Sequence, residues 1–493
     1  MAARKKTTAA PDVDVLIVGA GFSGLGLAVR LKTAGRERFL VIEKGDDVGG
    51  TWRDNTYPGC ACDIPSHLYS LSFEPKSDWS RLYPPQPELF EYLRKIARKH
   101  DLYEHIRLKT KMEAAVWDEA TGLWRVTTDQ GEEITARVLV SGIGALHIPS
   151  IPKLKGIEKF QGAAFHSAQW RHDVDLTDKR VAVIGTGASA IQFVPQIAPK
   201  VGKLTLFQRT APWVLPKIDG PIGPIQQFLF KSVPGYRVAF RALIYWINEA
   251  RALALVNNSR MIRIGEWYAR RFIAKHIADP ELQAKVTPSY KLGCKRVLLA
   301  NDYYPALARP NVEVVTDGVA EVKANSIVGK DGVERPVDAI IYGTGFDVTD
   351  SLKHLPITGR GGLLIADAWK DGVRGYYGIT VSGFPNYFML LGPNTGLGHN
   401  SQIVMIEAQI NYVMSALEKL DAGKIRALDL KPQVLDAHDR RIQDKLKASV
   451  WQQGGCTSWY QDATGRNVTL WPGFTFDYVK QTKVVNLDEY EAA

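Results

Sequence analysis

The chain opens with two short apolar runs that flank a segment of helical pattern. The runs cover residues 13–18 and 39–42, and residues 23–33 between them place apolar side chains at helical spacing. Parallel strands that are buried on both faces read as continuous apolar runs, and they need a crossover helix between them. The pattern therefore predicts a strand–helix–strand unit at the start of a parallel sheet.

The same pattern recurs further along the chain. Apolar runs at 180–184 and 204–207 flank a helical pattern at 188–197. Two more short apolar runs, at 138–140 and 339–341, each lead into a glycine-rich turn. Each turn lies where one unit would hand the chain to the other. We therefore expect an α/β fold in which a second domain is inserted into the first.

The domain boundaries are predicted from these turns. Residues 12–149 would form the first part of the first domain, residues 150–342 the inserted domain, and residues 343–493 the second part of the first domain. Pro149 and Pro152 mark the first connector.

Three segments stand apart from this pattern. Residues 1–11 are basic without a following apolar stretch, which predicts a disordered tail rather than a signal peptide. Residues from about 216 to 290 lack strand alternation and predict a helical insertion in the second domain, and residues 401–420 predict a long helix.

Composition adds little that is unusual. The 493 residues are 45% hydrophobic and 23% charged, as in ordinary globular proteins, and this length favours two or three domains. Lys and Arg outnumber Asp and Glu by 62 to 52, but the basic residues are scattered, so a nucleic-acid surface is not expected. A net charge of +10 suits a phosphate-bearing cofactor or an anionic membrane better.

The four cysteines, Cys60, Cys62, Cys294 and Cys456, show no zinc-type spacing. We expect no metal site and no disulfide framework in a chain of this length. A reducing, cytoplasmic setting fits this usage.

A glycine motif follows the first predicted strand, at Gly19–Ala20–Gly21–Phe22–Ser23–Gly24. Its glycines permit a tight turn, backbone approach to a pyrophosphate, and close packing of helix on strand. The helix N-terminus then offers free N–H groups to phosphates. Glu43 ends the next strand, where an acid accepts hydrogen bonds from ribose hydroxyls. This unit suits FAD.

The second unit has Gly185–Thr186–Gly187–Ala188–Ser189–Ala190, and its next strand ends in Gln208–Arg209–Thr210 instead of an acid. An acid would repel a 2′-phosphate, whereas arginine pairs with it. The second unit therefore suits NADPH. Both domains are predicted to be Rossmann-like, one for FAD and one for NADP.

The segment between the units, from Phe160 to Trp170, resembles the fingerprint of class B flavoprotein monooxygenases. It has Phe160, Gly162 and His166 at the family spacing. Ser167 and Trp170 resemble the type I Baeyer–Villiger branch, although Arg171 stands where that branch commonly has Pro or Asp. Segments 49–63, 343–347, 392–401 and 458–460 resemble the same branch.

The resemblance implies two sets of binding residues. The FAD set is Gly19, Gly21, Phe22, Ser23, Gly24, Glu43, Thr51, Trp52, Asp63, Tyr69, Met112 and Gln402. The NADP set is Gly185, Thr186, Gly187, Ala188, Ser189, Arg209, Thr210, Lys295, Arg296 and Trp459.

It also implies roles for single residues. Arg296 would reach over the flavin with Asp63 holding it in position, and Lys295 would contact the 2′-phosphate. His166, with Phe160, Gly162 and Trp170, would act at the linker between the domains, supporting NADPH binding and domain motion.

The implied reaction uses NADPH and O2. Hydride passes to the flavin, O2 then gives a peroxyflavin, and Arg296 stabilises its negative charge in a dry site. Attack on a ketone gives an ester or lactone, and sulfoxidation could accompany it. A flavin monooxygenase that oxygenates nitrogen or sulfur is the alternative, against which Trp170 and Cys62–Asp63 argue. A flavin disulfide reductase would need a different cysteine spacing. A non-catalytic dinucleotide-binding or membrane-associated protein is the remaining alternative.

Residues 224–256 combine aromatic and basic side chains, which two interpretations explain. The segment could lie in a membrane interface as a weak peripheral contact. The preferred interpretation packs its apolar face on the domain, where it lines the substrate entrance. Both point to an apolar ketone. No pattern in the sequence selects one ketone or an oligomeric state.

Overall fold

A computed structural model describes residues 10–257, 260–348, 356–423 and 425–492 of the chain. The basic tail predicted for residues 1–11 lies, up to residue 9, outside the described residues.

The first sheet is built around β1 (Val13–Val18), an apolar strand that pairs in parallel with β2 (Phe39–Ile42) and β6 (Glu133–Ser141). Its strand order is β17-β4-β5-β6-β1-β2-β3, with β18 also beside β6. The remaining strands are β3 (Ile106–Arg107), β4 (Met112–Asp118), β5 (Leu123–Thr128), β17 (Ile357–Thr358) and β18 (Tyr387–Met389). Because β17 and β18 come from the last third of the chain, the chain returns to this sheet after leaving it.

Helices cover the first sheet because their apolar faces match its buried strands. The predicted first helix is present as α1 (Phe22–Thr33), and the predicted long helix as α13 (Gln402–Asp421), which packs against α1. The other helices of this half are α2 (Thr51–Asp54), α3 (Gln86–Lys99), α12 (Ile365–Ala368), α14 (Pro432–Lys447), α15 (Val450–Gln453) and α16 (Thr475–Gln481).

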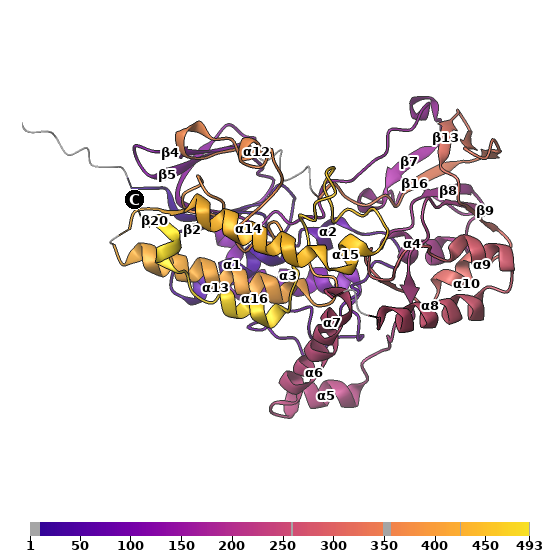
Figure 1. Cartoon of the computed structure of the whole chain (residues 1–493), viewed down its shortest axis with the longest axis horizontal. Helices are drawn as coiled ribbons and strands as arrows, with labels where there is room; N and C mark the ends of the chain where they lie inside the picture. The colour runs from indigo at the N-terminus through magenta and orange to yellow at the C-terminus, as the bar shows by residue number, and fades with distance from the viewer. Residues whose placement is uncertain (1–9, 258–259, 349–355, 424, 493) are drawn as a thin grey trace, which may run out of the picture.

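The second sheet is parallel throughout and has the order β12-β9-β8-β16-β7. It comprises β7 (Ala163–His166), β8 (Arg180–Ile184), β9 (Lys203–Phe207), β12 (Val312–Val315) and β16 (Ala339–Tyr342), with α4 (Ala190–Ile197) and α10 (Tyr303–Leu307) beside it. Figure 1 shows the two sheets at opposite ends of an elongated molecule.

The remaining strands of the described residues are short. They are β10 (Val214–Leu215), β11 (Leu298–Leu299), β13 (Val319–Val322), β14 (Ser326–Gly329), β15 (Glu334–Pro336), β19 (Leu428–Leu430) and β20 (Tyr490–Ala492).

The predicted helical insertion contains α5 (Pro224–Ser232), α6 (Tyr236–Ala250), α7 (Ala252–Leu255), α8 (Ile262–His276) and α9 (Pro280–Val286). The insertion divides between the two halves of the molecule, where the first half is the part built around the first sheet and the second half is the part built around the second sheet. Helix α8 packs near β10 and α10 of the second half. Helix α6 instead contacts the first half, where Arg241 donates to the carbonyl oxygens of His67 and Ser70.

One disulfide is present in the described residues, although no disulfide framework was expected. The structure joins Cys294 and Cys456, whose Cα atoms are 6.1 Å apart although 162 residues separate them in sequence. The fold brings these two loops together, which no local spacing reveals. Cys60 and Cys62 are free and buried.

The cytoplasmic setting stays a prediction. No helix in the described parts of the chain is long and apolar enough to cross a bilayer.

Candidate active site

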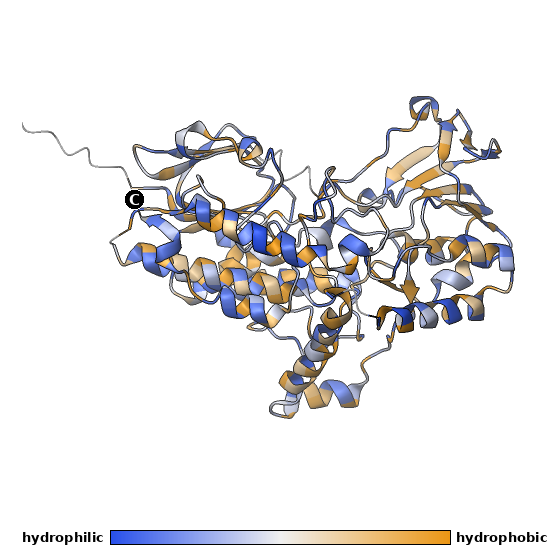
Figure 2. Ribbon diagram, in the orientation of Figure 1, coloured by the Kyte–Doolittle hydropathy of each residue, from blue (hydrophilic) through white to orange (hydrophobic). Residues whose placement is uncertain are grey.

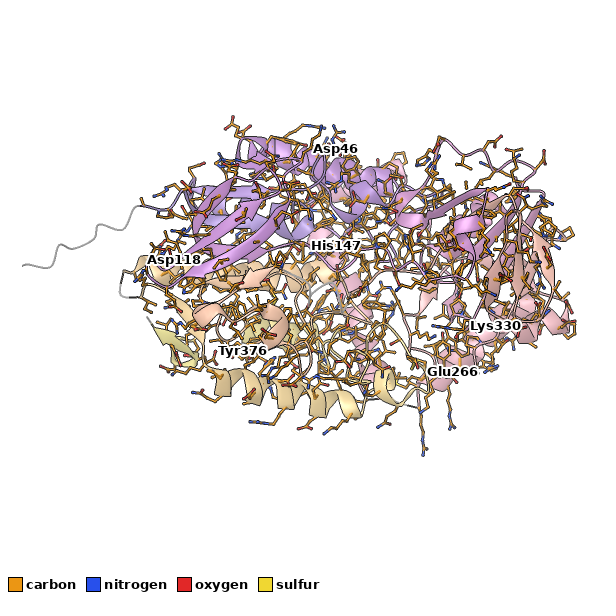
Figure 3. The ribbon with its side chains drawn as sticks, turned by 90° about the horizontal axis from the view of Figure 1, so that it is seen from above. Asp46, Asp118, His147, Glu266, Lys330 and Tyr376 are labelled. Atoms are coloured by element: carbon orange, nitrogen blue, oxygen red, sulfur yellow. A yellow bond between two sulfur atoms is a disulfide. The ribbon has the colours of Figure 1, made fainter. Side chains whose placement is uncertain are left out.

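A cavity of about 1480 Å³ lies where the carboxyl ends of strands from both sheets meet. Its walls include Gly19 after β1, Gly185 after β8 and Gly343 after β16. Ligands of open α/β sheets bind at this edge, outside the carboxyl ends of the strands. In Figure 3, His147, another residue of the cavity wall, lies in the middle of the molecule between the ends marked by Asp118 and Lys330.

The first glycine turn is shaped for close backbone approach. Gly19 has a φ of +102°, and a Cβ at Gly24 would lie 1.9 Å from the Gly19 carbonyl oxygen, so helix and strand meet there without side chains. Gly21 faces the cavity, and the nearest atom to its added Cβ is 3.8 Å away. A pyrophosphate fits against such a turn and the N-terminus of α1.

Glu43 is held by protein donors at the end of β2. Its Oε2 accepts from the Ala20 amide at 2.8 Å, and its Oε1 accepts from the Gly45 amide at 2.8 Å and from Arg53 at 3.0 Å. These bonds offset the cost of burying a carboxylate that is 5% exposed. The acid lines the cavity in a fixed position, and Arg53 is a neighbour that sequence patterns did not indicate.

Almost all of the expected FAD set lines this one cavity; only Gly24 does not, because it lies at the helix–strand contact. Two aromatic members support each other, since the Trp52 indole donates to the Tyr69 hydroxyl at 3.2 Å and Tyr69 packs edge-on against Phe22. The lining residues of the set are Gly19, Gly21, Phe22, Ser23, Glu43, Thr51, Trp52, Asp63, Tyr69, Met112 and Gln402. The open glycine turn, the fixed acid and the aromatic wall fit FAD.

The second glycine turn repeats the first. Gly185 also has a φ of +102°, and its added Cβ would lie 2.4 Å from the Gly343 carbonyl oxygen. Gly187 again faces open space, with its nearest neighbour at 3.7 Å. All of the expected NADP set lines the cavity, namely Gly185, Thr186, Gly187, Ala188, Ser189, Arg209, Thr210, Lys295, Arg296 and Trp459.

Arg209 and Lys295 bring two cations together without an acid. No ion pair of either residue is present in the described ranges. Burial, and then the nearby Arg209 guanidinium, lower the pKa of Lys295. Like charges are placed together at a cost unless an anion binds between them. The two side chains therefore fit the 2′-phosphate of NADPH.

Arg296 and Asp63 form an ion pair across the two halves of the molecule. The arginine donates from Nε at 2.8 Å and from Nη2 at 2.6 Å, both to Oδ2 of Asp63. The Asp63 carboxylate raises the pKa of Arg296, which keeps the guanidinium charged. Beside them, burial raises the pKa of Tyr460 to about 12. The result is a fixed cation on the wall of the cavity.

The four fingerprint residues Phe160, Gly162, His166 and Trp170 do not line the cavity. His166 ends β7, is fully buried, and accepts from the Ala168 amide through Nδ1. Its ring contacts Phe346, which belongs to the segment after β16, and Trp170 packs on Phe193 of α4. The fingerprint therefore contacts Phe346, which lines the cavity, and α4, the helix that follows the second glycine turn.

Gln192 is a contact between the halves that sequence patterns missed. It accepts from the Tyr57 hydroxyl at 3.0 Å and donates to the Ala61 carbonyl at 2.9 Å. A glutamine within a helix carries no signal that marks such a role.

Among the described residues, none between Pro212 and Tyr290 lines this cavity. The cavity wall therefore gives no support to the preferred interpretation that residues 224–256 line the substrate entrance, which stays a prediction. One face of α6 does pack on the molecule as expected, but on the first half: Tyr245 shares a hydrogen bond with Thr475 of α16.

Comparisons with known proteins agree with this geometry. A model of the flavin-binding monooxygenase-like family matches residues 12–353. The chain belongs to this family. A Baeyer–Villiger monooxygenase of Pseudomonas aeruginosa is 47% identical over 99% of this chain and 93% of its own length. Another from Streptomyces coelicolor is 46% identical over 97% of this chain and 92% of its own length.

Solved structures extend the comparison to the fold. OTEMO in complex with FAD and NADP matches with a TM-score of 0.90 at 28% identity, covering 98% of this chain and 100% of that chain. Cyclohexanone monooxygenase from Rhodococcus sp. Phi1 bound to NADP+ matches with a TM-score of 0.88 at 28% identity and the same coverage. The predicted fold of two Rossmann-like domains, the cofactors FAD and NADPH, and the Baeyer–Villiger type of this flavin monooxygenase are confirmed.

Proposed function

We propose that the protein inserts one oxygen atom of O2 beside the carbonyl of an apolar ketone and releases an ester or lactone. The observation that carries this proposal is the Arg296–Asp63 pair on the wall of a cavity to which both glycine turns open. A fixed cation stabilises negative charge that develops on oxygen.

Bound FAD supplies a hydride acceptor and the place at which O2 is activated, and NADPH supplies the hydride. Asp63 engages Nε and Nη2 of Arg296, so the guanidinium has a fixed orientation. No hydrogen bond from Nη1 is present within the described ranges, which leaves that group for the reacting oxygen. Arg296 thus stabilises and positions the reacting oxygen through its charge and its Nη1 group, and it does not transfer a proton.

The walls of the cavity favour an apolar substrate. Leu298 lines it two residues after Arg296, and Tyr460, which is buried and uncharged, lines it near the Arg296 guanidinium. Such a surface binds a ketone through apolar contact and leaves its carbonyl for the guanidinium. Arg209 and Lys295 would hold the NADPH phosphate away from this wall.

His166 and its fingerprint neighbours are linker residues in this proposal. The contact of His166 with Phe346 joins the end of β7 to the chain that returns to the first sheet. A movement of one half relative to the other would pass through this contact.

Product identification tests the proposed reaction. The holoenzyme with NADPH would be offered aliphatic, cyclic and aryl ketones, and a thioether and a tertiary amine in parallel. We expect esters or lactones from at least one ketone class. Exclusive formation of sulfoxide or N-oxide would instead support heteroatom oxygenation.

A further inference from the structure

Helices α5 and α6, followed by α7, project from the body of the molecule (Figure 1). Their inner side is anchored. Phe230 packs on His67 with ring centroids 4.1 Å apart, and Arg241 donates to backbone carbonyls of the first half. The projection is therefore a fixed part of the fold.

The opposite side of the projection is apolar and exposed. Residues 238, 239, 242, 243, 246, 247 and 250 recur at helical spacing, so they share one side of α6, and none is charged. The large side chains of this outer face, with that of α7, are Val238 (67% exposed), Leu243 (56%), Trp246 (57%), Ile247 (54%) and Leu253 (49%). Figure 2 shows the hydrophobic colouring of α6 on this projection.

The outer face continues onto a neighbouring helix. Phe476 of α16 lies 5.9 Å from Trp246 between ring centroids and is itself 40% exposed. Soluble monomers rarely expose a continuous apolar surface of this kind without a partner for it.

The exposed charges on the projecting helices α5, α6 and α7 have one sign. Between Asp219 and Glu266 the sequence has a single acid, Glu249, which is 1% exposed and bonded to Asn400 and Thr475. Besides the anchored Arg241, the projecting helices and the residue that joins α6 to α7 carry the basic side chains Lys231, Arg237 and Arg251, and Arg260 and Arg263 follow them in sequence. The projection thus presents apolar and cationic groups without exposed acids.

We propose that α5, α6 and α7 dock the enzyme on an anionic lipid bilayer, with the outer face in the interfacial layer and the basic side chains on lipid head groups. Interfacial helices combine these features: an apolar face with tryptophan, and cations beside it. A second copy of the chain fits less well, because isologous pairing would set the same cations against each other.

Vesicle co-sedimentation of the FAD-loaded enzyme tests this proposal. One vesicle would contain phosphatidylcholine alone and the other equal parts of phosphatidylcholine and phosphatidylglycerol. We expect binding to the anionic vesicle, weakened by high salt because screening shortens the reach of each charge. Absence of binding to the anionic vesicle at low salt would overturn the proposal.

Matched variants locate the surface. Lys231→Glu with Arg237→Glu should lower the partition coefficient by at least about fivefold for each cation removed. Lys330→Glu with Lys179→Glu makes the same charge change on the second half and should lower it much less. Trp246→Ser should weaken vesicle binding. The control Val333→Ser, at a residue that is 50% exposed and lies near Lys330, should leave binding unchanged.

Solution activity separates docking from damage. NADPH oxidation without vesicles and the flavin content should stay unchanged in all these variants, because none of the altered residues lines the cavity. Equal loss of binding in both members of a matched pair would overturn the assignment to α5–α7. A wild-type dimer that Trp246→Ser dissociates, without vesicle binding, would overturn it in favour of a second copy.

Discussion

We expect Arg209 and Lys295 to set coenzyme choice, because they are two cations that face the cavity without an acid between them. Lys295→Ala should raise the KM for NADPH by roughly tenfold or more, since a charge-assisted hydrogen bond contributes about 1.5–3 kcal/mol. The KM for NADH should change much less. Steady-state kinetics with both coenzymes gives the comparison, and Lys330→Ala serves as a control. Equal use of NADPH and NADH by the native enzyme would contradict this role.

Arg296 is expected to matter for oxygen transfer and not for FAD binding. Arg296→Ala should lower ester formation by about two to three powers of ten, the usual effect of removing one stabiliser of developing negative charge. The flavin content should stay normal, and NADPH oxidised by the variant should appear as hydrogen peroxide. Arg171→Ala, which alters an arginine outside the cavity, is the control. Normal ester yield from Arg296→Ala would mean that another group holds this role.

Single residues also show which features of the site could be predicted from sequence patterns and which could not. The glycines of both turns and Arg209 follow from local spacing. The Arg296–Asp63 pair spans 233 residues and was reached through family resemblance alone. Gln192 and the Cys294–Cys456 disulfide were not found, because their partners are distant in sequence and nothing local distinguishes them.

The junction of β1 and α1 has no space for a side chain. Because a Cβ at Gly24 would lie 1.9 Å from the Gly19 carbonyl oxygen, Gly24→Ala should push the helix from the strand and spoil the FAD turn. We expect a protein with little bound flavin and a lower melting temperature. Gly220→Ala is the matched control, since nothing lies within 4 Å of its Cβ. Flavin absorbance per protein reports the difference, and full flavin occupancy in Gly24→Ala would contradict the packing role.

Elements with strong periodicity were predicted well. The strand–helix–strand units are present as β1, α1 and β2 and as β8, α4 and β9. The antiparallel strands β4 and β5 were not predicted, because their half-exposed patterns depend on neighbouring strands. The helical insertion was predicted as helices, but its position away from the cavity depends on contacts such as Arg241 with His67 that the sequence does not reveal.

At the scale of the whole molecule, buried histidines make stability depend on pH. Burial lowers the pKa of His399 to about 4 and of His438 to about 3, from an ordinary value of 6.5. Unfolding lets both side chains protonate, so the stability present above pH 6.5 falls as the pH drops toward 4. The slope reaches about 1.4 kcal/mol per pH unit for each histidine. Melting temperatures between pH 8 and pH 4 should show this decline, and His438→Gln should reduce its slope. A flat profile would contradict it.

Both glycine turns and the Arg296–Asp63 pair face the same cavity, and this arrangement supports the proposed oxygen insertion beside a ketone carbonyl. The measurement that tests it most directly is mass spectrometry of the product formed from a ketone, NADPH and ¹⁸O₂. The proposed reaction predicts that each ester or lactone molecule carries one ¹⁸O atom. It also predicts that one product molecule forms for each NADPH consumed. A product without the label, or label found only in hydrogen peroxide with every ketone class, would contradict it.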